Sequence, residues 1–164
     1  MQSYRDLNHN YVSNDLSIIF LKLKSLSGCP DVITGEFDCF NNELSSLVGG
    51  PRHVDGHYAC DNNQLTDLVG CASHIGGNLY FRENQITSLV GIHKIIKRCN
   101  GFTFTSSIIK EGGIGLLLIE NLANITSYAA PFKIIEKYLG TGTKGMLACR
   151  DELIANGFEE YAKL

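Results

Sequence analysis

The chain has 164 residues, a formal net charge of −3 and 44% hydrophobic residues, which is typical of a folded domain. The charge gives no general attraction to nucleic acid, and no window approaches the roughly 18 consecutive apolar residues of a membrane-spanning helix. The polar start of the chain lacks the apolar core of a secretory signal peptide, which favours a cytoplasmic protein.

Residues 1–13 are polar with scattered aromatic residues, and we expect a short N-terminal arm or cap. A first, degenerate unit begins at residue 14, and its Leu21 occupies a position where later units have Asn. Terminal units of a repeat protein are expected to be atypical. The apolar run over residues 16–21 also fits a capping helix, and periodicity alone does not decide between strand and helix.

Three near-identical units follow over residues 35–49, 56–70 and 77–91, each offset by 21 residues from the one before. Self-similarity at a fixed period in this range is typical of a solenoid, in which each unit buries its apolar edge against its neighbours. The shared positions are Phe37, Tyr58 and Leu79; Cys39, Cys60 and Phe81; Asn42, Asn63 and Asn84; Leu44, Leu65 and Ile86; Leu47, Leu68 and Leu89; Gly49, Gly70 and Gly91; and Ile33, Val54, Ile75 and Ile96.

The spacing within a unit predicts a short strand followed by a turn. Phe37 and Cys39 are two residues apart, so both side chains lie on one face of a strand. A buried Asn such as Asn42 can bond the main-chain groups that the turn leaves unpaired, and repetition of this Asn predicts a ladder.

A fourth unit is expected with a shift of two residues, which aligns Phe102, Phe104, Ser107 and Ile109 with the third unit. The predicted solenoid therefore spans residues 14–110. Residues 111–164 are predicted to form a C-terminal helical cap, starting with the apolar run 116–119 over the open end of the stack. Two helices are expected after Pro131, with these residues on their apolar faces: Phe132, Ile135 and Leu139; Met146, Cys149 and Leu153.

The six cysteines are interpreted as free, buried thiols, because Cys39 and Cys60 share a position with Phe81. The sequence contains no Cys-x-x-Cys pair, and His53 and His74, one period apart, have no further ligands at suitable spacing. No cofactor and no metal site are predicted.

The spacing Phe37-x-Cys39-x-x-Asn42-x-Leu44-x-x-Leu47 resembles the leucine-rich repeat in its short bacterial form. The unit, together with the ending over residues 131–162, is also similar to proteins of tailed bacteriophages. The resemblance implies an α/β solenoid with parallel strands, and a protein of the host-cell cytoplasm. Thr34 stands where the usual leading Leu is found, which implies little or no regular helix on the convex side.

In leucine-rich repeats the strands line a concave surface that binds partner proteins. Alternation along the strands of this chain predicts that the following side chains project there: Asp38, Phe40, Ala59, Asp61, Tyr80, Arg82, Thr103 and Thr105. We take Asp38, Phe40, Asp61, Tyr80, Arg82 and Thr103 as candidate partner-binding residues, since Tyr and Arg are enriched where binding energy concentrates. The alternative is an ordinary solvated sheet face.

The favoured hypothesis is a non-enzymatic interaction module that binds a host protein, such as a defence factor, and inhibits or redirects it. Self-assembly into a structural or virion-associated protein is a second hypothesis, because a strand end exposed by a poor cap favours stacking between copies.

A small enzyme using Cys149 is the third hypothesis. The segment Cys149-Arg150-Asp151 matches the Cys-x-Asp motif of secreted bacterial ubiquitin ligases, but its spacing with Met146 and Leu153 favours core packing. Nucleic-acid binding is not expected. The basic cluster over residues 93–98 fits a solvated edge of the solenoid as well as it fits a phosphate-binding site.

Overall fold

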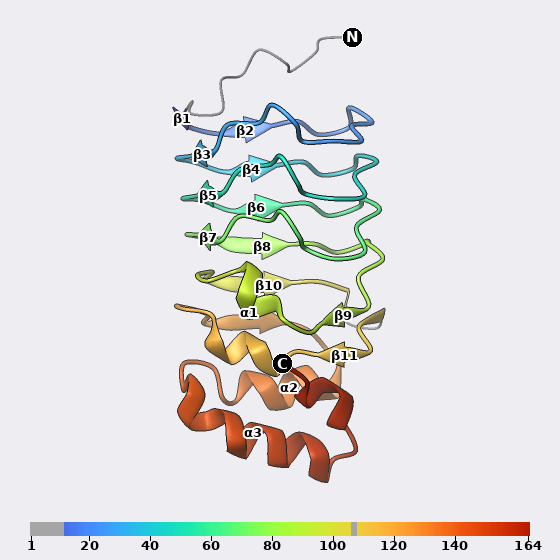
Figure 1. The fold of residues 1–164 in the computed structure, drawn as a ribbon, viewed down its shortest axis with the longest axis vertical. Coiled ribbons are helices and arrows are strands. Elements are labelled where there is room, and N and C mark those ends of the chain that lie inside the picture. Colours follow the sequence, from blue (N-terminus) through green and yellow to red (C-terminus); the bar gives the residue numbers. More distant parts are fainter. Residues whose placement is uncertain (1–11, 106–107) are drawn as a thin grey trace.

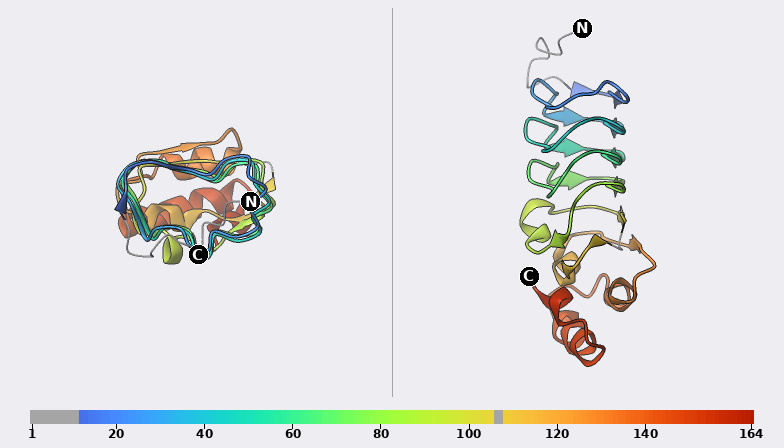
Figure 2. Two further views of the ribbon diagram at one scale, coloured as in Figure 1. Left: turned by 90° about the horizontal axis from the view of Figure 1, so that it is seen from above. Right: turned by 90° about the vertical axis from the view of Figure 1, so that its right-hand side faces the viewer.

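The computed structural model describes residues 12–105 and 108–164. The chain winds into a parallel β-solenoid of about five turns, with helices at its C-terminal end (Figure 1). Viewed along the stack, successive coils lie directly above one another (Figure 2). The outer face of the strands is therefore close to flat, and the concave surface expected from the leucine-rich-repeat resemblance is not formed.

Three parallel sheets run along the stack. The main sheet has the strand order β12-β10-β8-β6-β4-β2, the lateral sheet has the order β1-β3-β5-β7, and β9 pairs with β11. The main-sheet strands are β2 (Leu16–Ser17), β4 (Phe37–Asp38), β6 (Tyr58–Ala59), β8 (Asn78–Tyr80), β10 (Gly101–Thr103) and β12 (Asn124–Thr126). The other strands are β1 (Val12–Ser13), β3 (Val32–Ile33), β5 (His53–Val54), β7 (His74–Ile75), β9 (Ser88–Leu89) and β11 (Glu111–Gly112).

The strand register confirms the predicted alignment of the units. Phe37 lies opposite Tyr58, and Tyr58 lies opposite Leu79, at the offset of 21 residues. Leu79 lies opposite Phe102, which confirms the two-residue shift at this strand. Ser107, which is expected in the asparagine column of the fourth unit, lies outside the described residues. Leu16 lies opposite Phe37, so the degenerate first unit begins with a strand and not with a capping helix.

The predicted alignment of Ile33, Val54, Ile75 and Ile96 is wrong at Ile96. His74 bridges to Arg98, which places Cys99 and not Ile96 opposite Ile75. The additional residues of this coil form α1 (Ile92–Ile95), and Ile96 is the residue at its C-terminal end. Ile96 is nevertheless fully buried, because the short helix turns this apolar side chain into the core.

The asparagine column forms the predicted ladder. The Asn63 side-chain amide donates to the carbonyls of Cys39, Cys60 and Asp61, at 3.1, 3.2 and 3.2 Å. Its Oδ1 accepts from the Leu44 main-chain N–H at 3.0 Å. Each such Asn therefore bonds its own turn and the turn of the preceding coil, which ties neighbouring coils together. Asn42 and Asn84 repeat the arrangement.

The parallel sheet extends beyond residue 110, where the sequence predicts the end of the solenoid, because β12 pairs with β10. The chain then forms the C-terminal cap. Its elements are η3 (Ile114–Leu118), which precedes β12, α2 (Ala130–Glu136), α3 (Thr143–Ala155) and η4 (Glu159–Ala162). The buried residues of α2 and α3 include Phe132, Ile135, Cys149 and Leu153, as predicted.

A chain of aromatic contacts joins the solenoid core to this cap. The Phe81 and Phe104 rings stack at 5.0 Å, and Phe104 meets Phe132 of α2 edge-on at 4.9 Å. Phe132 in turn contacts Tyr161, whose hydroxyl donates to the carbonyl of Ile109 at 2.7 Å. The cap therefore continues the core of the solenoid instead of forming a separate one.

Candidate interaction surface

The candidate partner-binding residues share the outer face of the main sheet, which we call the outer face. Asp38, Tyr80 and Thr103 lie in one column, because the register pairs Asp38 with Ala59, Ala59 with Tyr80, and Tyr80 with Thr103. Two residues further along each strand, main-chain hydrogen bonds continue the same register through Phe40, Asp61 and Arg82. The structure therefore brings all six candidates together.

Asp61 and Arg82 form a fixed pair on the outer face. The Arg82 guanidinium donates through Nε and Nη2 to the two Asp61 carboxylate oxygens, at 3.2 and 3.1 Å. The Arg82 main-chain N–H also donates to Asp61. The Asp61 hydrogen bond is the main cause that raises the pKa of Arg82. Asp61 is only 5% exposed, and its hydrogen bonds to Arg82 tie its coil to the next one. The Arg82 side chain remains 54% exposed.

The two aromatic candidates are half-buried and positioned by neighbours. The Phe40 ring meets the Phe20 ring of the first coil edge-on, with centroids 5.3 Å apart. The Tyr80 hydroxyl accepts from the Asn78 amide at 3.2 Å, and its ring meets His57 at 5.6 Å. Both rings therefore present apolar surface with little freedom left to lose on binding.

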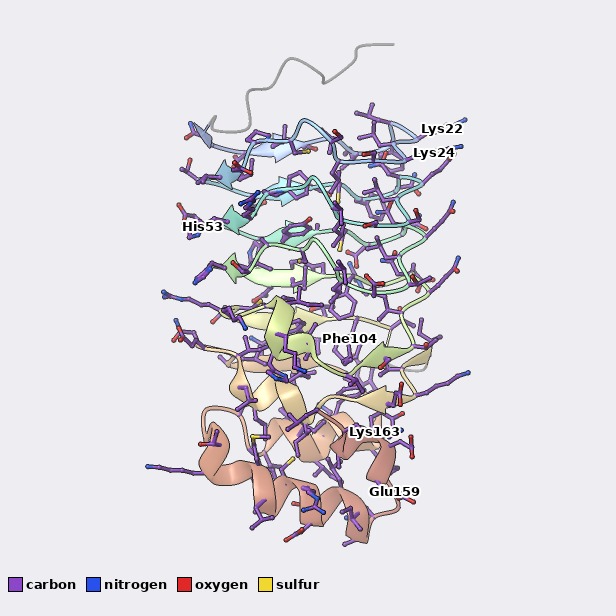
Figure 3. All side chains as sticks on the ribbon, in the orientation of Figure 1. Lys22, Lys24, His53, Phe104, Glu159 and Lys163 are labelled. Carbon is purple, nitrogen blue, oxygen red and sulfur yellow. The ribbon has the colours of Figure 1, made fainter. Side chains whose placement is uncertain are left out.

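The lateral sheet carries a histidine pair at its outer edge. The His53 and His74 rings stack with centroids 5.7 Å apart, and Figure 3 places His53 at this edge. His53 pairs with Asp55 at 2.9 Å and His74 with Ser73 at 2.9 Å. Within the described part of the chain, no group of three or more His, Cys, Asp or Glu side chains could hold a metal ion.

The predicted basic cluster is weaker than its sequence suggests. Burial, and then the nearby lysines, lower the pKa of His93, so this ring carries less positive charge than an ordinary histidine. Lys97 directs its ammonium group to the His93 carbonyl at 3.0 Å. Part of the cluster is thus engaged within its own segment.

All six thiols are free and buried. Burial, with a smaller contribution from Glu152, raises the pKa of Cys149 to about 11. Its side chain is fully covered, while Asp151 of the Cys-x-Asp motif points to solvent. A covered, protonated thiol is a packing group at neutral pH and is not arranged as a nucleophile.

Two apolar features were missed in the sequence. One position of successive units holds an exposed valine on each return loop: Val48, Val69 and Val90. Val48 also lines a hollow of about 420 Å³ between the loops. Ile19, Phe20 and Leu21 are exposed on the first coil. The strict 21-residue offset of the valines was the available signal for the first feature.

Comparison of the chain with protein families, with characterised proteins and with solved structures found no match. Among the described residues, no helix has the length and apolar character needed to cross a membrane.

Proposed function

We propose that the protein is a non-enzymatic interaction module that binds another protein through its outer face, with Phe40 and Tyr80 as anchors. The observation that carries this proposal is the placement of two half-buried aromatic rings on one rigid face, on either side of the Asp61–Arg82 pair. Aromatic residues flanked by polar groups are typical of the centre of protein interfaces.

The geometry of this face supports a protein partner over a small ligand. Phe40 lies on the second coil and Tyr80 on the fourth, so they are separated by about 10 Å along the stack at the usual strand spacing. The surface between them is formed by Ala59 and the Asp61–Arg82 pair. Anchors this far apart on a flat face suit a partner that covers several coils.

The expected partner class is a bacterial host protein, such as a defence or metabolic factor that the module would inhibit or redirect. This part of the proposal takes up the resemblance of the repeat sequence to tailed-bacteriophage proteins, and we infer from that resemblance that the protein acts in the host cytoplasm.

The test compares the wild-type protein with the double variant Phe40→Ala/Tyr80→Ala, each immobilised and exposed to a bacterial host lysate. The matched control is Val48→Ala/Val69→Ala, which removes two apolar side chains from the return loops, where they are more exposed than Phe40 and Tyr80. Any protein enriched on the wild type is then purified, and its dissociation constant is measured against all three forms.

We expect a partner whose affinity falls at least about tenfold with the outer-face variant and stays unchanged with the control. A partner that binds the outer-face variant as tightly as the wild type would place the interface elsewhere. The absence of any specifically enriched protein would count against the module itself.

A further inference from the structure

One side-chain column of the outer face has a gap in it. The register places Asp38, Ala59 and Tyr80 next to one another on β4, β6 and β8, which lie on successive coils of the stack (Figure 1). Asp38 and Tyr80 project full side chains, whereas the half-buried Ala59 between them projects only a Cβ. At the usual strand spacing Asp38 and Tyr80 are about 10 Å apart, so the space above Ala59 can receive a group from a partner.

The Asp38 carboxylate forms one wall of this gap and keeps most of its capacity to accept hydrogen bonds. Its Oδ1 accepts from the main-chain N–H of Phe40 at 2.9 Å, which fixes the side chain on the strand. Among the described residues, no Lys, Arg or His forms an ion pair with Asp38. The second carboxylate oxygen can therefore accept from a charged donor of a partner.

The Tyr80 ring forms the opposite wall and is held by two neighbours. Its hydroxyl accepts from the Asn78 side-chain amide at 3.2 Å, and the ring meets His57 edge-on with centroids 5.6 Å apart. The Nδ1 atom of His57 accepts from the Asn78 main-chain N–H at 2.8 Å, so this nitrogen carries no proton and the imidazole adds no positive charge beside the gap. Tyr80 thus offers an aromatic ring of the kind that attracts a cation.

The arginine of the outer face cannot fill the gap, because its guanidinium is already engaged. Arg82 donates through Nε and Nη2 to the two oxygens of Asp61, at 3.2 and 3.1 Å, and the two charges compensate each other. The Asp38 charge is left uncompensated, and the exposed Glu36, two residues earlier on the same face, adds a second negative charge. The charges around the gap therefore favour a cationic group over a neutral or acidic one.

We propose that the gap above Ala59 binds one arginine side chain of the partner protein, whose guanidinium donates to the Asp38 carboxylate and contacts the Tyr80 ring. A charged hydrogen bond of about 2.8 Å and a cation–ring distance of up to about 6 Å together come close to the spacing of about 10 Å between Asp38 and Tyr80. Arginine suits these walls better than lysine, because its broad, weakly hydrated guanidinium can contact a ring and a carboxylate at once. The inference rests on the proposed function, since it names the chemistry that the outer face recognises in its partner.

The test uses N-acetyl-arginine amide as the probe and follows the main-chain amide signals of the full chain by NMR during a titration. We expect saturable shifts centred on Asp38, Ala59 and Tyr80, with a dissociation constant on the order of millimolar. The lysine analogue should bind at least about fivefold more weakly, and the neutral citrulline analogue should give no saturable shift. Shifts centred elsewhere, no saturable shift with arginine, or equal affinity for the lysine or citrulline probe would overturn the proposal.

The carboxylate wall is tested by Asp38→Asn, which keeps an oxygen for the Phe40 N–H and removes the charge. We expect the dissociation constant of the arginine probe to rise at least about tenfold. Asp67→Asn is the matched control, because the Asp67 carboxylate accepts in the same way from the N–H of Val69, two residues further on, at 2.8 Å. This control should leave the affinity unchanged, and an equal loss in both variants would mean that the probe responds only to the net charge of the protein.

The gap itself is tested by Ala59→Leu, which fills the space between the two walls and should abolish binding of the probe. Ala148→Leu adds the same side chain to an exposed position of α3 and should have no effect. Unchanged affinity of the Ala59→Leu variant would show that the probe binds outside the gap.

The same variants distinguish a failure of this inference from a failure of the proposed function. A host protein that loses affinity for Phe40→Ala/Tyr80→Ala but binds Asp38→Asn and Ala59→Leu as tightly as the wild type would confirm the outer face as an interface and rule out the arginine contact. If the probe binds at the gap and no host protein depends on the outer face, the binding site remains and the proposed function is wrong.

Discussion

Replacement of Tyr58 by Phe should stabilise the protein. The Tyr58 ring lies in the core column against Phe37, with centroids 4.9 Å apart, and the residue is fully buried. Its hydroxyl has no hydrogen-bond partner within the described structure, and burial raises the pKa of this phenol well above its ordinary value. The hydroxyl lies near Gly50, where an added Cβ would be 3.4 Å from the oxygen.

The expected gain follows from two opposing terms. A buried hydroxyl without a partner costs about 1–3 kcal/mol. Removing one oxygen leaves a gap smaller than a water molecule, and the lost contacts cost about 0.5 kcal/mol. Tyr58→Phe should therefore raise the free energy of unfolding by about 1–2 kcal/mol, which corresponds to about 2–4 °C in Tm per kcal/mol for a chain of this size.

Urea unfolding measures this change directly, with an unchanged m-value as the sign that only stability has changed. Tyr80→Phe is the matched control, since its hydroxyl accepts a hydrogen bond from Asn78 and its ring is half-buried. The control should be neutral or lose up to about 1 kcal/mol. A lower free energy of unfolding for Tyr58→Phe would refute the reasoning, because it would mean that the hydroxyl is satisfied, for example by an internal water molecule.

Three further predictions concern the ladder, the bends and the thiols. Asn63→Ala removes four hydrogen bonds from buried turns and should cost about 3–5 kcal/mol in urea unfolding, against about 1 kcal/mol for Asn62→Ala at the neighbouring exposed position. In thermal unfolding, Gly70→Ala should be far more damaging than Gly140→Ala. Both glycines have positive φ, but an added Cβ lies 2.4 Å from a main-chain nitrogen at Gly70 and meets nothing within 4 Å at Gly140. Finally, burial raises the pKa of all six thiols in the folded protein, so above pH about 9 the unfolded chain binds fewer protons than the folded one. The free energy of unfolding should then fall as pH rises, by about 1 kcal/mol per thiol at pH 10, and a flat profile between pH 8 and pH 10 would contradict this.

The solenoid repeat could be predicted from the sequence because each repeated position has one structural role. An asparagine is required wherever two turns lie one above the other, as at Asn42, Asn63 and Asn84. The longer fourth coil is visible in the sequence as the offset of 23 residues between Leu79 and Phe102. The same offset, applied once more, would have placed Ile125 in register with Phe102 and shown that the sheet continues.

Other features depend on information that a period does not contain. The break in the Ile96 column arises from α1, whose few residues carry no distinct helical pattern. Alternation places Asp61 and Arg82 on one face but does not say whether their side chains project to solvent or pair with each other. Whether the two side chains pair depends on their rotamers and on the hydrogen bond that the Arg82 main-chain N–H donates to the Asp61 carboxylate.

The Asp61–Arg82 pair means that the candidate residues differ in how they can be tested. Some hold the fold together, and others contribute only to the surface. Asp61 is buried and bonds the next coil, so Asp61→Ala would leave the Arg82 guanidinium and N–H without their partner and weaken the stack as well as the surface. Phe40 and Tyr80 are half-buried, and their side chains make no hydrogen bond to a buried main-chain group of the described structure. Truncating these two rings therefore changes the surface more than the fold, and a loss of binding in that double variant reports on the interface itself.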